Sequence, residues 1–442
     1  MNSAQSAPLA VVANAHATDG PPCDRERTAC CFTSSVQRRR RHPRVGLVLS
    51  GGGARGAYEA GVLAGLEDVL GGSRRRGPRF DVVTGTSVGA INVAHAAGSA
   101  DLEDHGVQHL VQLWTSLQVE THLRPRLRRF VACRENATKL HLGRALLDAR
   151  PFERLVEHEI RWPALHENVR RGVVEAVIVS ALNIANGRTV SFVETTPGVA
   201  YVSTQDASRT SRRATLSSGH VLASAAIPLL FPARRIGDSY FCDGGLRFNT
   251  PISPAIRAGA ERLVVVALRA ARAAGDENAA LEQYPNLIFL LGKVFDALLL
   301  DPIDRDLQML ERLNQVVEVL EQELGPEAFL RVDRVLEADR GLPYRHIETL
   351  VFRPTEDIGV LALEHLRAHR TKLCRPGATS AVLLENLASL GARVEADVLS
   401  FLLFDGRFAR TLIELGKRDV RRRAAEVEAF FAPQSSGTSE VA

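Results

Sequence analysis

Short apolar runs alternate with longer stretches of helical periodicity between residue 45 and about residue 270. Apolar runs bounded by Gly, Asn, Asp or Ser predict strands, and apolar residues that recur every three or four positions predict helices. The predicted strands are 45–49, 80–84, 173–182, 189–194, 239–242 and 263–268, and the predicted helices include 54–70 and one that starts at Val88. This alternation predicts an α/β fold with a mostly parallel central sheet.

One connection departs from this pattern. Asn186-Gly187 stands between two of the apolar runs. This dipeptide favours a tight hairpin turn, because both of its residues tolerate a positive φ. We therefore expect one local antiparallel pair within the sheet.

Helical periodicity replaces the strand signals beyond about residue 275. Six apolar residues fall on one face of a long predicted helix, which Gly325-Pro326 ends or interrupts: Leu307, Leu310, Leu313, Val317, Leu320 and Leu324. A second helical group is predicted over 378–431. Both groups are expected to pack on the α/β part, because each presents an apolar face.

Composition and charge limit the class of protein. The chain has 442 residues, of which 45% are hydrophobic and 24% charged, as in soluble globular proteins. A formal charge of +4 is too small to indicate a nucleic-acid partner. Arginine clusters at 38–41 and 421–423 are candidates for peripheral contact with an anionic membrane.

Cysteine usage and hydropathy bear on the compartment. Six cysteines lie at 23, 30, 31, 133, 242 and 374 without the paired CxxC spacing of a zinc site, which favours a reducing compartment. No apolar run is long enough to predict a membrane span. Segment 8–17 faintly resembles the apolar part of a signal peptide, but no Lys or Arg precedes it. We expect a cytoplasmic protein and leave secretion open.

The first candidate site is the glycine-rich turn after strand 45–49. Its spacing, Gly51-x-Gly53-x-x-Gly56, matches the dinucleotide-binding fingerprint. That fingerprint also requires an acidic residue at the end of the next strand, to hold a ribose hydroxyl. Here the next strand has Asp81 at its beginning and the sequence TGTSVGA at its end, so the nucleotide interpretation loses its second element.

A candidate nucleophile stands in that second sequence. Gly85, Ser87 and Gly89 form a G-x-S-x-G pattern that follows a predicted strand and opens a predicted helix. A serine on such a turn projects its hydroxyl from the backbone, and small neighbours allow the turn to close. The alternative is a serine that only caps the helix.

The glycine turn then gains a different role. Nucleophilic attack on an ester creates an oxyanion, which backbone N–H groups stabilise, and Gly51, Gly52 and Gly53 can supply such donors. Both turns follow neighbouring parallel strands and should meet at one sheet edge. Arg55 is expected either to bind an anionic head group or to hold the loop; the alternative is an ordinary surface arginine.

Two candidates for the catalytic base define two kinds of enzyme. An α/β-hydrolase triad requires a late histidine such as His346. In YFCDGGLRFNTP, Asp243 ends a short strand, and its carboxylate could reach the serine directly. That arrangement requires burial to raise the pKa of Asp243 or close contact with Ser87. The alternative is an ordinary Asp-Gly turn.

The ordered motifs resemble those of the patatin-like phospholipase family: GGGARG at 51–56, GTSVGA at 85–90, ASAAIPLLFP at 223–232 and DGGLRFNTP at 243–251. The resemblance covers about 45–268. It implies a three-layer α/β/α sandwich and a Ser-Asp dyad of Ser87 and Asp243 that cleaves acyl esters of phospholipids or other lipids, as a phospholipase A or lysophospholipase does. It also implies an oxyanion hole at 51–53 and no metal or cofactor. The positions that support the motifs are Arg55, Gly56, Gly85, Gly89, Gly244 and Gly245.

Composition, periodicity and the resemblance together give the expected domain organisation. We predict a disordered basic arm over 1–43, a patatin-like catalytic domain over 44–270, a helical C-terminal region over 271–432 and a disordered tail over 433–442. Segment 401–423 looks similar to C-terminal parts of some bacterial members, and no catalytic role is assigned to it.

Two further interpretations were weighed. The pairs His105/His109 and His365/His369 share helix spacing but lack the Glu of a zinc-binding HExxH motif, and we interpret them as surface histidines. A catalytically silent membrane-binding module is the rival to an enzyme, with the basic arm and 421–423 touching lipid. The oligomeric state stays open.

Overall fold

The computed structural model describes residues 42–73, 77–118, 121, 124–125, 145, 147–270, 302–373 and 393–433. The predicted basic arm up to residue 41, five of the six cysteines and the tail from residue 434 lie outside these residues. The predictions made for them are therefore not tested.

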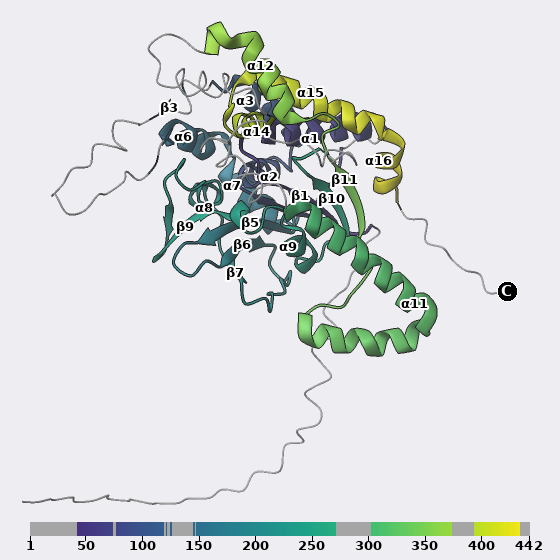
Figure 1. The fold of residues 1–442 in the computed structure, drawn as a ribbon. Coiled ribbons are helices and arrows are strands. Elements are labelled where there is room, and N and C mark those ends of the chain that lie inside the picture. The colour runs from purple at the N-terminus through teal and green to yellow at the C-terminus, as the bar shows by residue number, and fades with distance from the viewer. Residues whose placement is uncertain are drawn as a thin grey trace, which may run out of the picture. The chain divides into compact units, whose positions relative to one another are not determined.

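A nine-stranded sheet forms the centre of the described chain. Its main order is β11, β10, β1, β2, β5, β6, β7, with β9 paired to β5 and β8 paired to β9. The bounds are β1 Val45–Leu49, β2 Val82–Thr86, β5 Ala176–Asn183, β6 Thr189–Thr195, β7 Arg209–Arg213, β8 Arg234–Ile236, β9 Ser239–Asp243, β10 Arg262–Val266 and β11 Glu348–Phe352. Strands β11 to β5 in this order all run parallel, which confirms the predicted mostly parallel sheet (Figure 1).

The expected antiparallel pair is present. Strand β6 runs antiparallel to β5, with Ala181 opposite Val190, and Gly187 in the connecting turn has a φ of 65°. The Asn186-Gly187 signal therefore predicted this hairpin correctly. A separate two-stranded pair joins β3 (Arg124–Pro125) to β4 (Leu147–Asp148).

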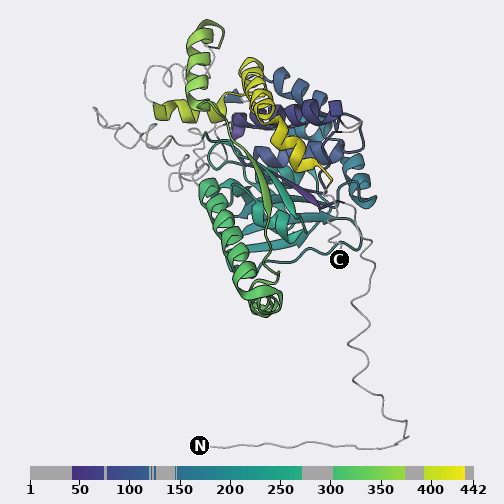
Figure 2. The same ribbon diagram turned by 90° about the vertical axis from the view of Figure 1, so that its right-hand side faces the viewer.

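Helices cover both faces of the sheet. Because side chains alternate along a strand, Leu47 and Leu49 of β1 enter one apolar core, whereas Val48 enters another. The first core includes residues of α1 (Gly56–Ser73), α2 (Val88–Gly98), α3 (Val107–Ser116) and α15 (Gly406–Arg422), and the second includes residues of α9 (Ile252–Arg257) and α11 (Pro302–Arg340). The predicted three-layer α/β/α sandwich is confirmed (Figures 1 and 2).

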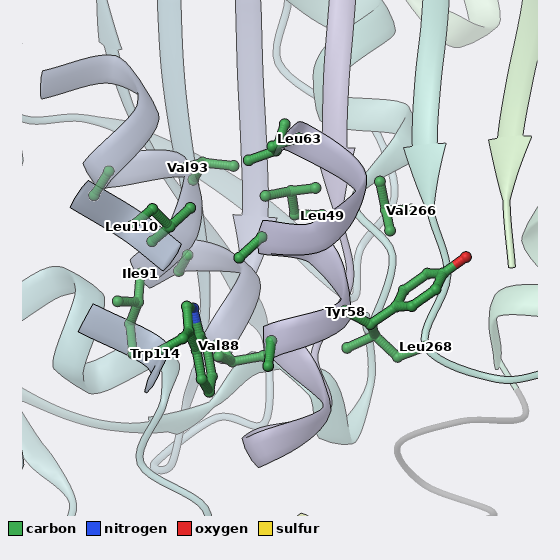
Figure 3. Close-up of a cluster of buried hydrophobic side chains, with 14 of the residues drawn as sticks. Leu49, Tyr58, Leu63, Val88, Ile91, Val93, Leu110, Trp114, Val266 and Leu268 are labelled. Carbon is green, nitrogen blue, oxygen red and sulfur yellow. The ribbon is translucent and has the colours of Figure 1, made fainter. Parts of the chain in front are cut away.

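The first core includes residues next to the glycine turn and next to the turn that carries Ser87. Leu49 and Val266 of the sheet meet Leu63 of α1 and Val93 of α2 there (Figure 3). Helix α15 packs closely on α1, since a Cβ atom on Gly61 would lie 2.3 Å from the carbonyl oxygen of Ile413. The C-terminal helices are thus part of the same core.

The C-terminal half contains one strand that the sequence analysis did not predict. Strand β11 lies parallel to β10 at the edge of the sheet, inside the region expected to be helical. Its sequence ETLVF is short and half polar, so its pattern is too weak to stand out from the helical periodicity around it. The predicted interruption at Gly325 is confirmed, because this residue has a φ of 72° inside α11.

The remaining elements connect these layers. Their bounds are η1 Gly53–Arg55, α6 Arg150–Glu159, α7 Trp162–Arg170, α8 Ser218–Ser224, η2 Gly244–Leu246, α12 Ile358–Leu373, α14 Arg393–Leu402 and α16 Ala424–Phe431. Among the helices described, none combines the length and the apolar character that crossing a membrane requires.

Candidate active site

Ser87 occupies a sharp turn between β2 and α2. Its φ of 55° and ψ of −125° are unusual for a residue other than glycine. The turn closes only because its neighbours are small: a Cβ atom on Gly89 would lie 2.4 Å from the Leu49 carbonyl oxygen, and one on Gly85 would lie 2.3 Å from the Gly89 carbonyl oxygen. The Ser87 side chain makes no capping hydrogen bond to α2, so the alternative of a helix-capping serine is wrong.

The Ser87 hydroxyl points to a carboxylate instead. Its Oγ donates a 2.6 Å hydrogen bond to Oδ2 of Asp243, which is completely buried. The other oxygen, Oδ1, accepts a 2.7 Å hydrogen bond from the backbone N–H of Gly245. Asp243 is therefore more than an Asp-Gly turn, although it also caps η2.

Strand register explains why these two residues meet. Strand β2 pairs with β5 up to Thr86, which lies opposite Ser180. Strand β9 approaches from the other direction and pairs with β5 so that Asp243 lies opposite Ala181. Because the two strands end head to head along β5, the residue after β2 and the last residue of β9 come together.

Burial changes the acidity of this carboxylate. It raises the pKa of Asp243 to about 7, and the hydrogen bonds from Ser87 and Gly245 oppose the rise. A carboxylate with a pKa near 7 is a far stronger base than an exposed aspartate. The structure thus has both features that would allow Asp243 to act as a base, a raised pKa and close contact with Ser87.

The glycine turn lies beside Ser87, since a Cβ atom on Gly51 would lie 3.0 Å from the Ser87 Cβ. The Gly51 N–H is already used, because it donates a 3.2 Å hydrogen bond to the carbonyl oxygen of Asn249. Within the described part of the chain, the Gly52 and Gly53 N–H groups have no hydrogen-bonded protein acceptor. Two of the three predicted donors therefore remain free to bind an oxyanion.

Arg55 is not a surface residue, which corrects one of the interpretations above. It is only 2% exposed and donates hydrogen bonds to Ser400, Asp397 and the Leu268 carbonyl oxygen. Its guanidinium forms an ion pair with Asp397. The structure therefore gives no support to a contact between Arg55 and a lipid head group. The neighbouring Gly56 lets α1 approach α2, because a Cβ atom there would lie 2.4 Å from Val88 Cγ2.

Residues 47–256 match the family model of the patatin-like phospholipases. This part of the chain is a patatin-like phospholipase domain. A cGAMP-activated phospholipase of Pseudomonas aeruginosa is 30% identical over 215 residues, and a lysophospholipase of Aspergillus terreus is 47% identical over 58 residues. These matches cover 46% and 13% of this chain, and 53% and 3% of the relatives. The chain thus spans about half the length of the first relative.

Two solved structures are weakly similar to the whole chain. Human group IVD cytosolic phospholipase A2, in complex with a fluorophosphonate, has a TM-score of 0.30 at 13% identity, with 87% of this chain and 60% of that chain covered. VipD from Legionella pneumophila has a TM-score of 0.27 at 14% identity, with coverages of 85% and 67%.

The other candidate for the catalytic base, His346, lies far from Ser87. His346 is exposed and precedes β11, which runs parallel to β10, β1 and β2. Ser87 follows the carboxyl end of β2, whereas His346 precedes the amino end of β11. The two residues therefore lie at opposite ends of the parallel strands. The structure does not bring this histidine to Ser87, and the interpretation as an α/β-hydrolase triad has no support.

The paired histidines are only partly as expected. His365 is buried and bonded to Asp405 at 3.1 Å, so its interpretation as a surface histidine is wrong. His105 contacts Glu67, and His109 contacts His95. In the described ranges, no three His, Cys, Asp or Glu residues are grouped so that they could hold a metal ion.

Sequence reasoning missed several residues that shape the patatin-like site. Ser224 Oγ accepts a 2.9 Å hydrogen bond from the Ser87 N–H and donates to the Ser180 carbonyl oxygen. Asn249 Nδ2 donates to the Gly51 carbonyl oxygen at 3.1 Å. Both residues lie in the quoted motifs, ASAAIPLLFP and DGGLRFNTP, but the motifs alone assign them no contact.

A small apolar cavity lies between α2, α3 and α6, close in sequence to Ser87. Its walls include Val88, Ile91, Leu110, Trp114, Phe152 and Val156, and the first four are labelled in Figure 3. Val88 links the cavity to the turn, because it follows Ser87 directly in the sequence.

Proposed function

We propose that this protein is a lipid acyl hydrolase that cleaves carboxylic esters through a Ser87–Asp243 dyad and an acyl-enzyme intermediate. The observation that carries the proposal is the 2.6 Å hydrogen bond from Ser87 Oγ to a fully buried carboxylate whose pKa is near 7. Free N–H groups of Gly52 and Gly53 beside it support the same chemistry.

The first half-reaction acylates the serine. Ser87 Oγ attacks the acyl carbonyl carbon and passes its proton to Asp243, and the N–H groups of Gly52 and Gly53 bind the oxyanion. The tetrahedral intermediate collapses as the ester C–O bond breaks, and Asp243 gives its proton to the leaving alcohol. The products are an acyl-serine and a free alcohol.

The second half-reaction releases the acid. Water attacks the acyl-serine carbonyl and gives a proton to the Asp243 carboxylate, and the same N–H groups bind the second oxyanion. Collapse breaks the bond to Ser87 Oγ, which takes the proton back. The cycle uses no metal or cofactor, because Asp243 transfers the proton and the N–H groups stabilise the charge.

Phospholipids and lysophospholipids are the proposed substrates. The small cavity between α2, α3 and α6 has apolar walls, which suit part of an acyl chain. Both curated relatives are named as phospholipases or lysophospholipases. Such a substrate brings the enzyme to a membrane surface.

Arginines 421–423 are not proposed as the membrane contact. Arg421 pairs with Asp68, Arg422 with Asp419 and Arg423 with Glu426. These ion pairs within the fold neutralise the positive charge that would attract anionic lipid.

Product analysis tests the function and separates it from a silent lipid-binding module. A mixed lipid extract is incubated with the wild-type protein or with Ser87→Ala, and the products are identified by mass spectrometry. We expect free fatty acid and the matching lysolipid or alcohol with the wild type only. Vesicle binding by the wild type without any such product would instead support the binding module.

A further inference from the structure

The oxyanion loop is connected to the C-terminal helices through one buried cation. Arg55 follows the glycine turn directly, and its guanidinium is held mainly by α14. Its Nε donates to Ser400 Oγ at 2.7 Å, its Nη2 donates to Asp397 Oδ1 at 2.7 Å, and the Phe401 ring lies 4.5 Å from the guanidinium carbon. Helix α14 lies outside the residues that match the family model.

Close contacts with α14 and with Leu268 surround the two glycines of the loop. A Cβ atom on Gly53 would lie 2.3 Å from the Phe401 carbonyl oxygen, and one on Gly52 would lie 2.5 Å from Leu268 Cδ1. Gly52 and Gly53, whose N–H groups are free, are therefore packed closely between the end of α14 and the segment after β10. Their N–H directions depend on where α14 sits.

Electrostatics make Asp397 the essential member of this contact. The Arg55 side chain is only 3% exposed, and a buried guanidinium without a counter-ion is unfavourable. Asp397 is its only ion-pair partner in the described part of the chain. Ser400 holds the geometry, because its hydroxyl accepts from Arg55 and donates to the Asp397 carbonyl oxygen at 2.6 Å.

We infer that Asp397 is a positioning residue for ester hydrolysis. By holding Arg55, it fixes the turn that carries the N–H groups of Gly52 and Gly53, and helix α14 thereby completes the oxyanion hole. This inference rests on the proposed function, since it assigns a role in the same reaction. It also means that residues 42–270 alone are not the complete catalytic unit.

Steady-state kinetics of the full chain on a short-chain ester test this inference. Oxyanion donors act in the transition state, so loss of their positions should lower kcat and leave KM nearly unchanged. We expect Asp397→Ala to lower kcat by about 100-fold. Asp397→Asn keeps an oxygen that accepts from Arg55 but removes the counter-charge, so we expect it to recover only part of that loss.

Asp419→Asn is the matched control. Asp419 is a buried carboxylate of α15 that accepts a 3.1 Å hydrogen bond from Tyr58 of α1. Like Asp397 it joins the C-terminal helices to the domain, but it does not contact the glycine turn. We expect this variant to melt at a lower temperature and to keep its kcat.

A second readout does not depend on activity. Hydrogen exchange of the peptide covering 50–56, followed by mass spectrometry, should be faster in Asp397→Ala than in the wild type and unchanged in Asp419→Asn. If Asp397→Ala does not fold, Ser400→Ala replaces it, with an expected drop in kcat of about tenfold.

The outcomes separate this inference from the proposed function. A folded Asp397→Ala or Ser400→Ala variant with wild-type kcat, or with unchanged exchange at 50–56, would overturn the positioning role and leave the dyad intact. A wild-type protein that hydrolyses no ester would overturn the proposed function, while the exchange experiment would still report whether Asp397 holds the loop.

Discussion

Ser87 and Asp243 are 156 positions apart in the sequence, yet the hydroxyl of one donates a 2.6 Å hydrogen bond to the carboxylate of the other. The contact arises where the ends of β2 and β9 meet along β5. No histidine in the part of the chain described here bonds to either residue. In the described part of the chain the Ser87 hydroxyl donates to this buried aspartate, and in the proposed mechanism the aspartate is its base.

The pH dependence of hydrolysis should report the titration of Asp243. The carboxylate must be ionised to accept the serine proton, and burial raises its pKa to about 7. We expect kcat/KM for a neutral ester to rise about tenfold per pH unit below pH 7 and to level off above it. A flat profile from pH 5 to 9 would show that Asp243 is not the base.

The ionised Asp243 carboxylate should also lower the free energy of unfolding at alkaline pH. Burial raises its pKa in the folded state to about 7, above that of an exposed aspartate, so the protonated form favours folding and this contribution is lost as the pH rises through about 7. We expect Asp243→Asn to be inactive and, at pH 8, more stable than the wild type by up to about 4 kcal/mol. Urea unfolding at several pH values measures this, and the difference should disappear near pH 4.

The two candidate bases can be separated by mutation. His346 is exposed and lies at the amino end of the parallel strands, whereas Ser87 lies at their carboxyl end. We expect His346→Ala to keep nearly full kcat, because its imidazole contacts neither the nucleophile nor the glycine turn, whereas Asp243→Asn should lose activity to background. The reverse pattern in an esterase assay would favour a triad.

The glycine turn should not tolerate a side chain at Gly53. This residue has a φ of 57°, and an added Cβ would collide with the Phe401 carbonyl oxygen. We expect Gly53→Ala to lower the free energy of unfolding by about 3 kcal/mol and kcat by about 100-fold.

Gly71→Ala is the control for this substitution. Gly71 lies in α1, where a Cβ would meet only the end of the Glu67 side chain at 3.4 Å. Alanine should stabilise the helix there by up to about 1 kcal/mol and leave kcat unchanged. Equal kinetics for Gly53→Ala and the wild type would remove the turn from the mechanism.

Local signals in the sequence predicted much of the fold. Strand β1 was predicted to its exact bounds, because its short apolar run ends just before Ser50 and a glycine run. The Asn186-Gly187 turn and the break at Gly325 were also predicted, since each depends on a backbone conformation that few residues adopt. In contrast, β11 was missed, because its pairing with β10 is a long-range contact with little local pattern.

The sequence predicted the main residues of the candidate site but not their hydrogen-bond partners. Ser87, Asp243 and the glycine turn came from motif spacing, and the structure brings them together. The motifs did not show that Gly51 donates to Asn249, or that Arg55 is buried against a serine 345 positions later in the chain. Such partners come from tertiary packing of the C-terminal helices, which periodicity alone does not place.

The central claim is that Ser87 is the nucleophile and Asp243 its base. Covalent labelling by a fluorophosphonate, located by peptide mass spectrometry and followed by the remaining esterase activity, tests it most directly. We predict one adduct, on Ser87, with loss of activity in proportion to labelling, much slower labelling of Asp243→Asn and none of Ser87→Ala. Labelling of another residue, or full ester hydrolysis by folded Ser87→Ala, would contradict the account.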